Sequence, residues 1–159
     1  MKLRIGHSTD IHQLVPNRDL ILGGIKIDYE KGLLGHSDAD CLLHAITEAI
    51  IGALGLGDIG KHFPDTNPAY KDIDSKILLK KAFNMAKEKG YQINNLDCTI
   101  FAEKPKMAPY IPDMRKIIAE ILDTDIENVN IKATRGEKMG FVGRGEGIVC
   151  EAVVLLIKN

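Results

Sequence analysis

Three stretches of the chain repeat apolar side chains at helical spacing. They cover residues 41–53, residues 75–90 and residues 110–122. This period predicts three amphipathic helices, and Gly90 is a typical stop for the second of them. Ser37 or Asp38 would serve as the N-cap of the first helix, and Ser75 as the cap of the second. Nothing on the second helix indicates chemistry, so we expect it to be purely structural.

Shorter stretches have the composition and alternation that are typical of strands. They cover residues 3–9, 96–103, 129–134 and 148–157. Two short apolar runs around Gly23-Gly24 predict a β-hairpin over residues 20–27. The last strand is apolar at both odd and even positions, so we expect both of its faces to be buried.

These elements predict an α/β (α+β) fold, with a small mixed β-sheet and the three main helices packed on one face. A chain of 159 residues with 45% hydrophobic content fits a single domain over residues 1–159. Three helices are few for both faces of a sheet. We therefore expect further copies of the chain to cover the other face.

The charge and the cysteine content indicate which binding partners and which cellular compartment to expect. Lys and Arg total 21 against 22 Asp and Glu, so no basic field favours nucleic acid or an anionic membrane. Cys41, Cys98 and Cys150 are odd in number, unclustered and set in apolar segments, as expected for reduced core residues. The most apolar run, 148–157, is too short to span a bilayer, and no export signal is recognisable. We expect a soluble, cytoplasmic protein.

Two segments bring together the residue types of an open zinc site. Asp10 and His12 stand two apart at the end of the first predicted strand, so both can project from one face. His44 lies about two turns into the first predicted helix. One carboxylate and two imidazoles leave a fourth position for water or substrate. A single histidine on an amphipathic helix is more often a hydrogen-bonded core residue, so spacing alone leaves both interpretations open.

Two glycine-rich segments are ambiguous or unspecific by themselves. The composition of residues 54–68, rich in Gly, Pro and Asp, is typical of a connecting loop. Its glycines would nevertheless allow a ligand to approach the backbone closely. Residues 140–147 lack the Walker spacing and no helix is expected after them, so a P-loop is not predicted.

With these residues laid out, nearly the whole chain resembles the family of 2-C-methyl-D-erythritol 2,4-cyclodiphosphate synthases. Six motifs carry the resemblance in order: Arg4-Ile5-Gly6-His7 through Asp10-x-His12, Gly35-His36-Ser37-Asp38-x-Asp40 through His44, Gly57-Asp58-Ile59-Gly60 through Phe63-Pro64-Asp65-Thr66, Pro105-Lys106-Met107, Lys132-Ala133-Thr134 through Glu137, and Gly140-Phe141 through Gly143-Arg144-Gly145-Glu146-Gly147.

The resemblance implies a role for each matching position. Asp10, His12 and His44 look like the ligands of one zinc ion per subunit. Glu137 looks like the ligand of a second divalent ion, magnesium or manganese, on the diphosphate. His36, with Arg135 and Glu137, falls at the catalytic positions. The implied substrate contacts are Asp10, His12, His36, Ser37, Asp58, Ile59, Gly60, Phe63, Pro64, Asp65, Thr66, Asn67, Ala102, Glu103, Lys104, Pro105, Lys106, Met107, Ala108, Thr134, Arg135, Gly136, Glu137, Phe141 and Arg144.

Within that set, the resemblance assigns each segment to one part of the ligand. His36 and Ser37 flank the phosphates, and residues 63–67 lie over the erythritol phosphate. Residues 102–108 form the cytosine pocket. The implied reaction converts 4-diphosphocytidyl-2-C-methyl-D-erythritol 2-phosphate to the 2,4-cyclodiphosphate and CMP, in the non-mevalonate route to isoprenoid precursors. The implied assembly is a homotrimer with active sites between subunits and its sheets around the axis.

The chain departs from the family pattern at two places. Arg135-Gly136 stands where the family usually has two hydroxyl residues or a hydroxyl residue and Asn, so a guanidinium replaces the expected hydroxyl at position 135. Arg135 either binds phosphate oxygens directly or swings out and leaves backbone N–H groups to do so. Ser8-Thr9 replaces the usual Gly and aromatic residue, which we expect to affect packing more than chemistry.

Two other classes remain open from the sequence. A zinc-dependent phosphoesterase would use the same ligands with an activated water. A non-catalytic protein that binds cytidine nucleotides would keep the base pocket and lose turnover.

Overall fold

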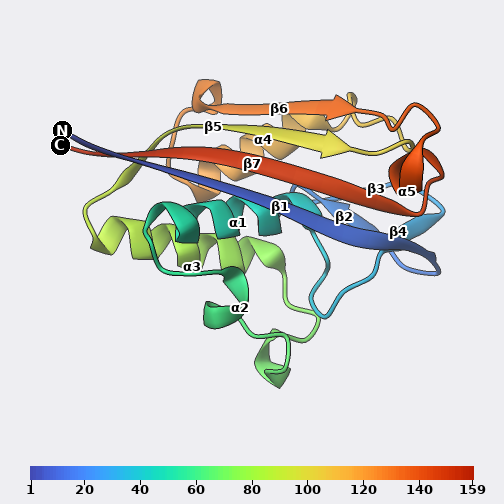
Figure 1. The fold of residues 1–159 in the computed structure, drawn as a ribbon, viewed down its shortest axis with the longest axis horizontal. Coiled ribbons are helices and arrows are strands. Elements are labelled where there is room, and N and C mark those ends of the chain that lie inside the picture. The colour runs from blue at the N-terminus through green and yellow to red at the C-terminus, as the bar shows by residue number, and fades with distance from the viewer.

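A computed structural model describes all 159 residues. Its centre is a five-stranded sheet in the order β4-β1-β7-β5-β6 (Figure 1). The strands are β1 (Lys2–Pro16), β4 (Lys31–Leu33), β5 (Gln92–Phe101), β6 (Val129–Thr134) and β7 (Gly147–Lys158). β5 and β6 are parallel, whereas the other neighbouring strands are antiparallel, so the expected mixed sheet is confirmed.

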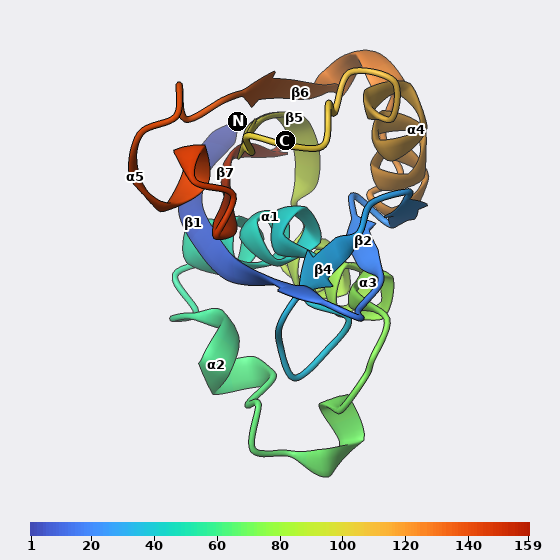
Figure 2. The same cartoon turned by 90° about the vertical axis from the view of Figure 1, so that its right-hand side faces the viewer.

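Three helices cover one face of this sheet, as the sequence predicts. Figure 2 shows α1 (Cys41–Ala53), α3 (Ser75–Glu88) and α4 (Ile111–Ile121) together on the same side. The hairpin is confirmed as β2 (Leu20–Leu22) and β3 (Ile25–Ile27). The remaining short elements are α2 (Ile59–His62), η1 (Pro68–Tyr70), η2 (Ile126–Asn128) and α5 (Gly140–Gly143). None of the helices has the length and apolar character needed to cross a bilayer.

Several local predictions were wrong in detail. The first strand continues to Pro16, so Asp10 and His12 lie within β1 and not at its end. The N-cap of α1 is Asp40, which places His44 in the first turn and not two turns in. Asp74, not Ser75, caps α3. A four-residue helix, α5, lies inside the glycine-rich segment 140–147.

A close contact between β1 and α1 fixes the position of the site. A Cβ placed on Gly6 would lie 1.8 Å from the carbonyl oxygen of Ala49, so only glycine lets the strand and helix approach this closely. The even-numbered residues of β1 face α1, since side chains alternate along a strand. Asp10 and His12 therefore point toward the helix that carries His44.

The second face of the sheet is open in a single chain. On β7, the even-numbered residues from Ile148 to Leu156 are fully buried, whereas Val153 on the opposite face is 38% exposed. Ile5 and Ile11 on β1 are 70% and 57% exposed on that same face. The expected burial of both faces of β7 thus does not occur within one chain.

Candidate metal centre and substrate cleft

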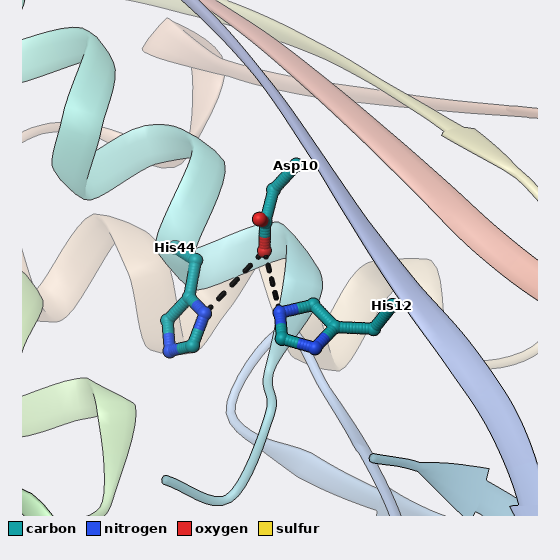
Figure 3. Close-up of side chains that lie close together, drawn as sticks. All are labelled: Asp10, His12 and His44. Carbon is teal, nitrogen blue, oxygen red and sulfur yellow. Dashed lines mark ion pairs between the residues drawn. The ribbon is translucent and has the colours of Figure 1, made fainter. Parts of the chain in front are cut away.

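Asp10, His12 and His44 converge on one point between β1 and α1 (Figure 3). Asp10 Oδ2 lies 2.9 Å from His12 Nε2 and 3.4 Å from His44 Nδ1. Ligand atoms around one tetrahedral zinc ion, each at about 2.0–2.1 Å, stand roughly 3.3 Å apart. The three side chains therefore have the spacing of a three-ligand metal centre, and the prediction from the sequence is confirmed in geometry.

The hydrogen bonds of His12 show why this arrangement suits a cation. His12 Nδ1 lies 2.8 Å from the carbonyl oxygen of Leu34, so Nδ1 carries the hydrogen in the neutral ring. The lone pair on Nε2 then faces Asp10 Oδ2, a buried oxygen that has no satisfying hydrogen bond in the chain. Two lone pairs at this distance repel each other, and either a proton or a metal ion between them removes the conflict.

The charges of this cluster shift two pKa values in opposite directions. Burial alone would raise the pKa of Asp10, but hydrogen bonds and charge interactions with the protonated forms of His12 and His44 together outweigh it and lower the pKa to about 2. Burial is the largest single effect and would lower the pKa of His12, but the hydrogen bond and charge attraction of the protonated ring to Asp10, together with its hydrogen bond to the carbonyl of Leu34, outweigh burial and raise the pKa above its usual value of 6.5. Asp10 is thus ionised throughout the physiological range, and His12 holds its proton more tightly than a free imidazole does.

The affinity of the three ligands for a divalent metal ion should therefore fall as the pH is lowered through the raised pKa of His12. A proton and a metal ion compete for Nε2, so below that pKa we expect a loss of about tenfold per pH unit for one displaced proton. Competition with a chromophoric chelator between pH 8 and pH 5 measures this. An affinity that stays constant over the range would exclude His12 as a ligand.

In the metal-free protein the same shifts stabilise the folded state within a defined window. The contribution of His12, whose folded pKa is raised, is complete below about pH 6.5 and is lost as the pH rises through the folded value. The contribution of Asp10, whose folded pKa is lowered, is complete above about pH 4 and is lost as the pH falls toward 2. The ion pair is therefore most stabilising between these limits.

A cavity of about 600 Å³ opens directly onto the three ligands. It is lined by Asp10, His12, Gly35, His36, Ser37, His44, Ile59, Gly60, Phe63, Pro64, Asp65, Thr66, Tyr70, Ile73 and Leu78. We call it the metal-side cavity. It brings together most of the predicted contacts from the first half of the chain. Tyr70, Ile73 and Leu78 also line it, and no motif or spacing in the sequence marks them as site residues.

Two predicted residues support the metal-side cavity without lining it. Asp58 caps α2, where its Oδ1 accepts a hydrogen bond from the backbone N–H of Lys61. Asn67 caps η1, and its carbonyl oxygen lies 3.2 Å from His36 Nε2. Both therefore shape the segment over the cavity.

Glu48 is a supporting residue that the sequence did not reveal. One carboxylate oxygen accepts from the backbone N–H of Ile59 at 2.9 Å and the other from the hydroxyl of Ser8 at 2.6 Å. Ser8 is almost fully buried, so its departure from the family pattern serves this link between β1, α1 and α2. The expectation that position 8 concerns packing fits this contact.

A second cavity, of about 740 Å³, lies at the ends of β5 and β6. Its lining residues are Tyr29, Ala102, Glu103, Lys104, Pro105, Lys106, Met107, Ala108, Ala133, Thr134 and Arg135. We call it the base-side cavity. The structure thus brings together the predicted segment 102–108 with Thr134 and Arg135, and adds Tyr29. The two cavities share no lining residue.

The remaining predicted residues line neither cavity in a single chain. Gly136 lies beside the base-side cavity, and its N–H donates to Glu103 at 2.9 Å. A Cβ on Gly136 would come within 2.4 Å of the backbone nitrogen of Gly143, so the usual larger residue does not fit this loop. Glu137, Phe141 and Arg144 follow in the loop before β7, where Arg144 forms an exposed ion pair with Glu146.

The comparisons with known proteins agree with this geometry. The model of the YgbB family matches residues 3–157. The 2-C-methyl-D-erythritol 2,4-cyclodiphosphate synthase of Bacillus cytotoxicus is 61% identical over 98% of this chain and 99% of its own length. This chain therefore belongs to the YgbB family.

Two solved structures have the same fold. The bifunctional IspDF of Campylobacter jejuni superposes with a TM-score of 0.93 at 41% identity, over 98% of this chain but only 42% of that longer one. The CDP complex of IspF from Plasmodium falciparum superposes with a TM-score of 0.87 at 36% identity, over 99% and 97% of the two chains.

Proposed function

We propose that this chain is a 2-C-methyl-D-erythritol 2,4-cyclodiphosphate synthase, and that residues 1–159 act as one domain. The enzyme converts 4-diphosphocytidyl-2-C-methyl-D-erythritol 2-phosphate to the cyclic diphosphate and CMP, in the non-mevalonate route to isoprenoid precursors. The observation that carries the proposal is the convergence of Asp10, His12 and His44 on a cavity lined by further motif residues, in a chain whose family match spans residues 3–157.

The reaction needs no nucleophile from the protein. An oxygen of the 2-phosphate attacks the β-phosphorus, a new P–O bond closes the ring, and the bond to the CMP phosphate breaks. The protein must therefore fold the substrate so that its phosphates approach, and it must offset their negative charge. Asp10, His12 and His44 would hold the divalent ion, for which we propose zinc, and this ion would supply positive charge to polarise and orient the β-phosphate.

The other residues of the metal-side cavity position the phosphates. His36 and Ser37 come from the loop that leads into α1 and line the cavity next to the ligands. The backbone of Ile59 and Gly60, in the first turn of α2, reaches the same cavity. Residues 63–67 cover the erythritol end. These groups exclude water and fix the attacking oxygen in line.

The base-side cavity takes the cytidine part of the substrate. Its backbone between Ala102 and Ala108 offers the donors and acceptors that a cytosine ring requires, and Lys104 and Lys106 bring positive charge. Arg135 lines this cavity and makes no hydrogen bond or ion pair within the chain, so its guanidinium is free to bind phosphate oxygens.

Glu137 is the proposed ligand of a second ion, magnesium or manganese. It is exposed and belongs to no cluster of three or more metal-ligating side chains. Magnesium commonly keeps several waters and binds through one carboxylate plus substrate phosphates, so a lone carboxylate fits this role.

A shared site between copies explains the separation of the two cavities. The substrate joins a cytidine to an erythritol phosphate, yet its two proposed subsites have no residue in common in one chain. The open face of the sheet, with exposed Ile5 and Ile11, offers a surface for neighbouring copies. We therefore propose a homotrimer that packs its sheets around the axis and forms each site from two subunits.

The state of the three cysteines bears on the cellular compartment in which the protein works. Cys41, Cys98 and Cys150 are all free and buried, which supports a reducing, cytoplasmic setting.

A single assay tests the reaction. The protein is incubated with the cytidyl substrate, zinc and magnesium, and the products are separated. We expect CMP and the cyclic diphosphate in equal amounts. Release of inorganic phosphate with an open-chain product would instead identify a zinc phosphoesterase, and binding of CMP without conversion would identify a non-catalytic protein.

A further inference from the structure

The ligand His44 is contacted from behind by Ser75 on α3, and Ser75 is in turn hydrogen-bonded to Asp38 in the loop before α1. His44 Nδ1 faces Asp10, whereas His44 Nε2 lies 2.8 Å from Ser75 Oγ. Ser75 is fully buried, and its hydroxyl donates to Asp38 Oδ1 at 2.5 Å. The backbone N–H of Ser75 donates to the other oxygen of Asp38 at 3.0 Å. α3, expected to be purely structural, therefore contributes a side chain to the metal centre.

The direction of these hydrogen bonds follows from what each group can donate. A neutral imidazole carries its hydrogen on one nitrogen and a lone pair on the other. Nδ1 needs the lone pair to act as a ligand, so Nε2 carries the hydrogen and donates it to Ser75 Oγ. The hydroxyl of Ser75 then donates to Asp38, which accepts. In this arrangement His44 Nε2 donates to Ser75 Oγ, and Ser75 Oγ both accepts from His44 and donates to Asp38.

We propose that Ser75 and Asp38 are positioning residues for the ligand His44. Ligating histidines commonly donate their second ring nitrogen to a carbonyl or carboxylate, which fixes the ring orientation and makes the ligating nitrogen more basic. His12 has such a partner in the carbonyl oxygen of Leu34. Ser75, backed by Asp38, performs the same task for His44. The inference rests on the proposed metal centre.

The same arrangement leaves the hydroxyl hydrogen of Ser37 free. Ser37 Oγ has two polar neighbours in the chain, the N–H of Ala39 at 3.1 Å and His44 Nε2 at 3.1 Å. With the hydrogen of His44 on Nε2 and directed at Ser75, neither neighbour has a lone pair that could accept from Ser37. The hydroxyl of Ser37 consequently has no acceptor within the chain and can donate to a phosphate oxygen in the metal-side cavity.

The test is zinc binding without substrate, so its failure would leave the proposed reaction untouched. Zinc dissociation constants are measured by chelator competition for the intact protein and for Ser75→Ala. Loss of a partner of this kind typically weakens metal affinity by about 10- to 100-fold, and we expect a change of that size. Asp38→Asn should weaken zinc binding in the same direction, because the amide is a poorer acceptor for the serine hydroxyl.

Asp74→Ala is the matched control. Asp74 caps the same turn of α3 through the N–H of Lys76 and does not contact His44. This variant should lose stability but keep its zinc affinity. If Ser75→Ala bound zinc as tightly as the unmodified protein, or if it weakened zinc binding no more than Asp74→Ala, the proposal would be wrong.

A second measurement needs no variant and decides the matter even if Ser75→Ala fails to fold. ¹⁵N NMR of the histidine rings in the zinc-loaded protein distinguishes a metal-bound nitrogen from a protonated one. We expect zinc at Nδ1 of His44 and a slowly exchanging hydrogen at Nε2. Zinc at Nε2, or a rapidly exchanging Nε2 hydrogen, would overturn the proposed role of Ser75.

Discussion

Replacing His44 by alanine is expected to lower the rate of CMP release by about a thousandfold or more, because charge stabilisation by a metal ion is worth several kcal/mol in the transition state. The fold should persist, since His44 lies at the edge of the core and its side chain is partly exposed. Turnover under saturating substrate measures the rate, circular dichroism shows whether the fold persists, and the zinc content shows whether the ion is still bound. Near-normal turnover by protein without bound zinc would contradict the proposed mechanism.

Co-expression turns this variant into a test of the shared site. Chains with His44→Ala are co-expressed with chains that carry Glu137→Gln. Each variant expressed alone should be inactive. If each site takes its metal ligands from one subunit and Glu137 from the next, random mixing restores about one quarter of the sites. If both groups belonged to one chain, no intact site would form and the mixture would stay inactive.

Replacing Asp40 by alanine is expected to destabilise the fold by about 4 kcal/mol, because it leaves several buried donors unmatched. Asp40 is fully buried, and its carboxylate accepts from the N–H of Leu43 as the cap of α1. It also accepts from the N–H groups of Gly23 and Gly24 at the tip of the β2–β3 hairpin. Urea unfolding of the metal-free protein measures the change.

Asp74→Ala provides the comparison for this prediction too. Asp74 caps α3 by a single exposed hydrogen bond, so its removal should cost about 1 kcal/mol. The difference between the losses of unfolding free energy in the two variants measures the contribution of the hydrogen bonds that Asp40 accepts from the hairpin. Equal losses would show that Asp40 acts as a helix cap alone.

The repeating patterns in the sequence were sufficient for the helices and most strands, and they brought Asp10, His12 and His44 forward as possible metal ligands. α4 and β6 lie within one residue of their predicted bounds, because their apolar periods are regular and their ends are clearly marked. Asp10 and His12 could be paired from the alternation of β1. The remaining site residues came from the family resemblance and not from periodicity.

The predictions that failed concern polar side chains with distant partners. Ser37, Asp38 and Asp40 are all acceptable N-caps by local chemistry. Asp40 is the N-cap of α1 in the structure. Asp38 instead accepts hydrogen bonds from Ser75, 37 residues later, whereas Asp40 also accepts hydrogen bonds from the β2–β3 hairpin. Ser75 was similarly read as a helix cap, although its hydroxyl lies against His44.

By itself, the sequence determined the helices, most of the strands and the three candidate ligands, since these depend on residue type and local period. Only the tertiary structure showed that Asp10 lies 2.9 Å from His12 and 3.4 Å from His44. It also showed that Ser75, hydrogen-bonded to Asp38, contacts His44 from behind, and that most of the predicted substrate contacts divide between two cavities. Such contacts join segments far apart in the chain, and a periodic pattern carries no information about which distant side chains meet.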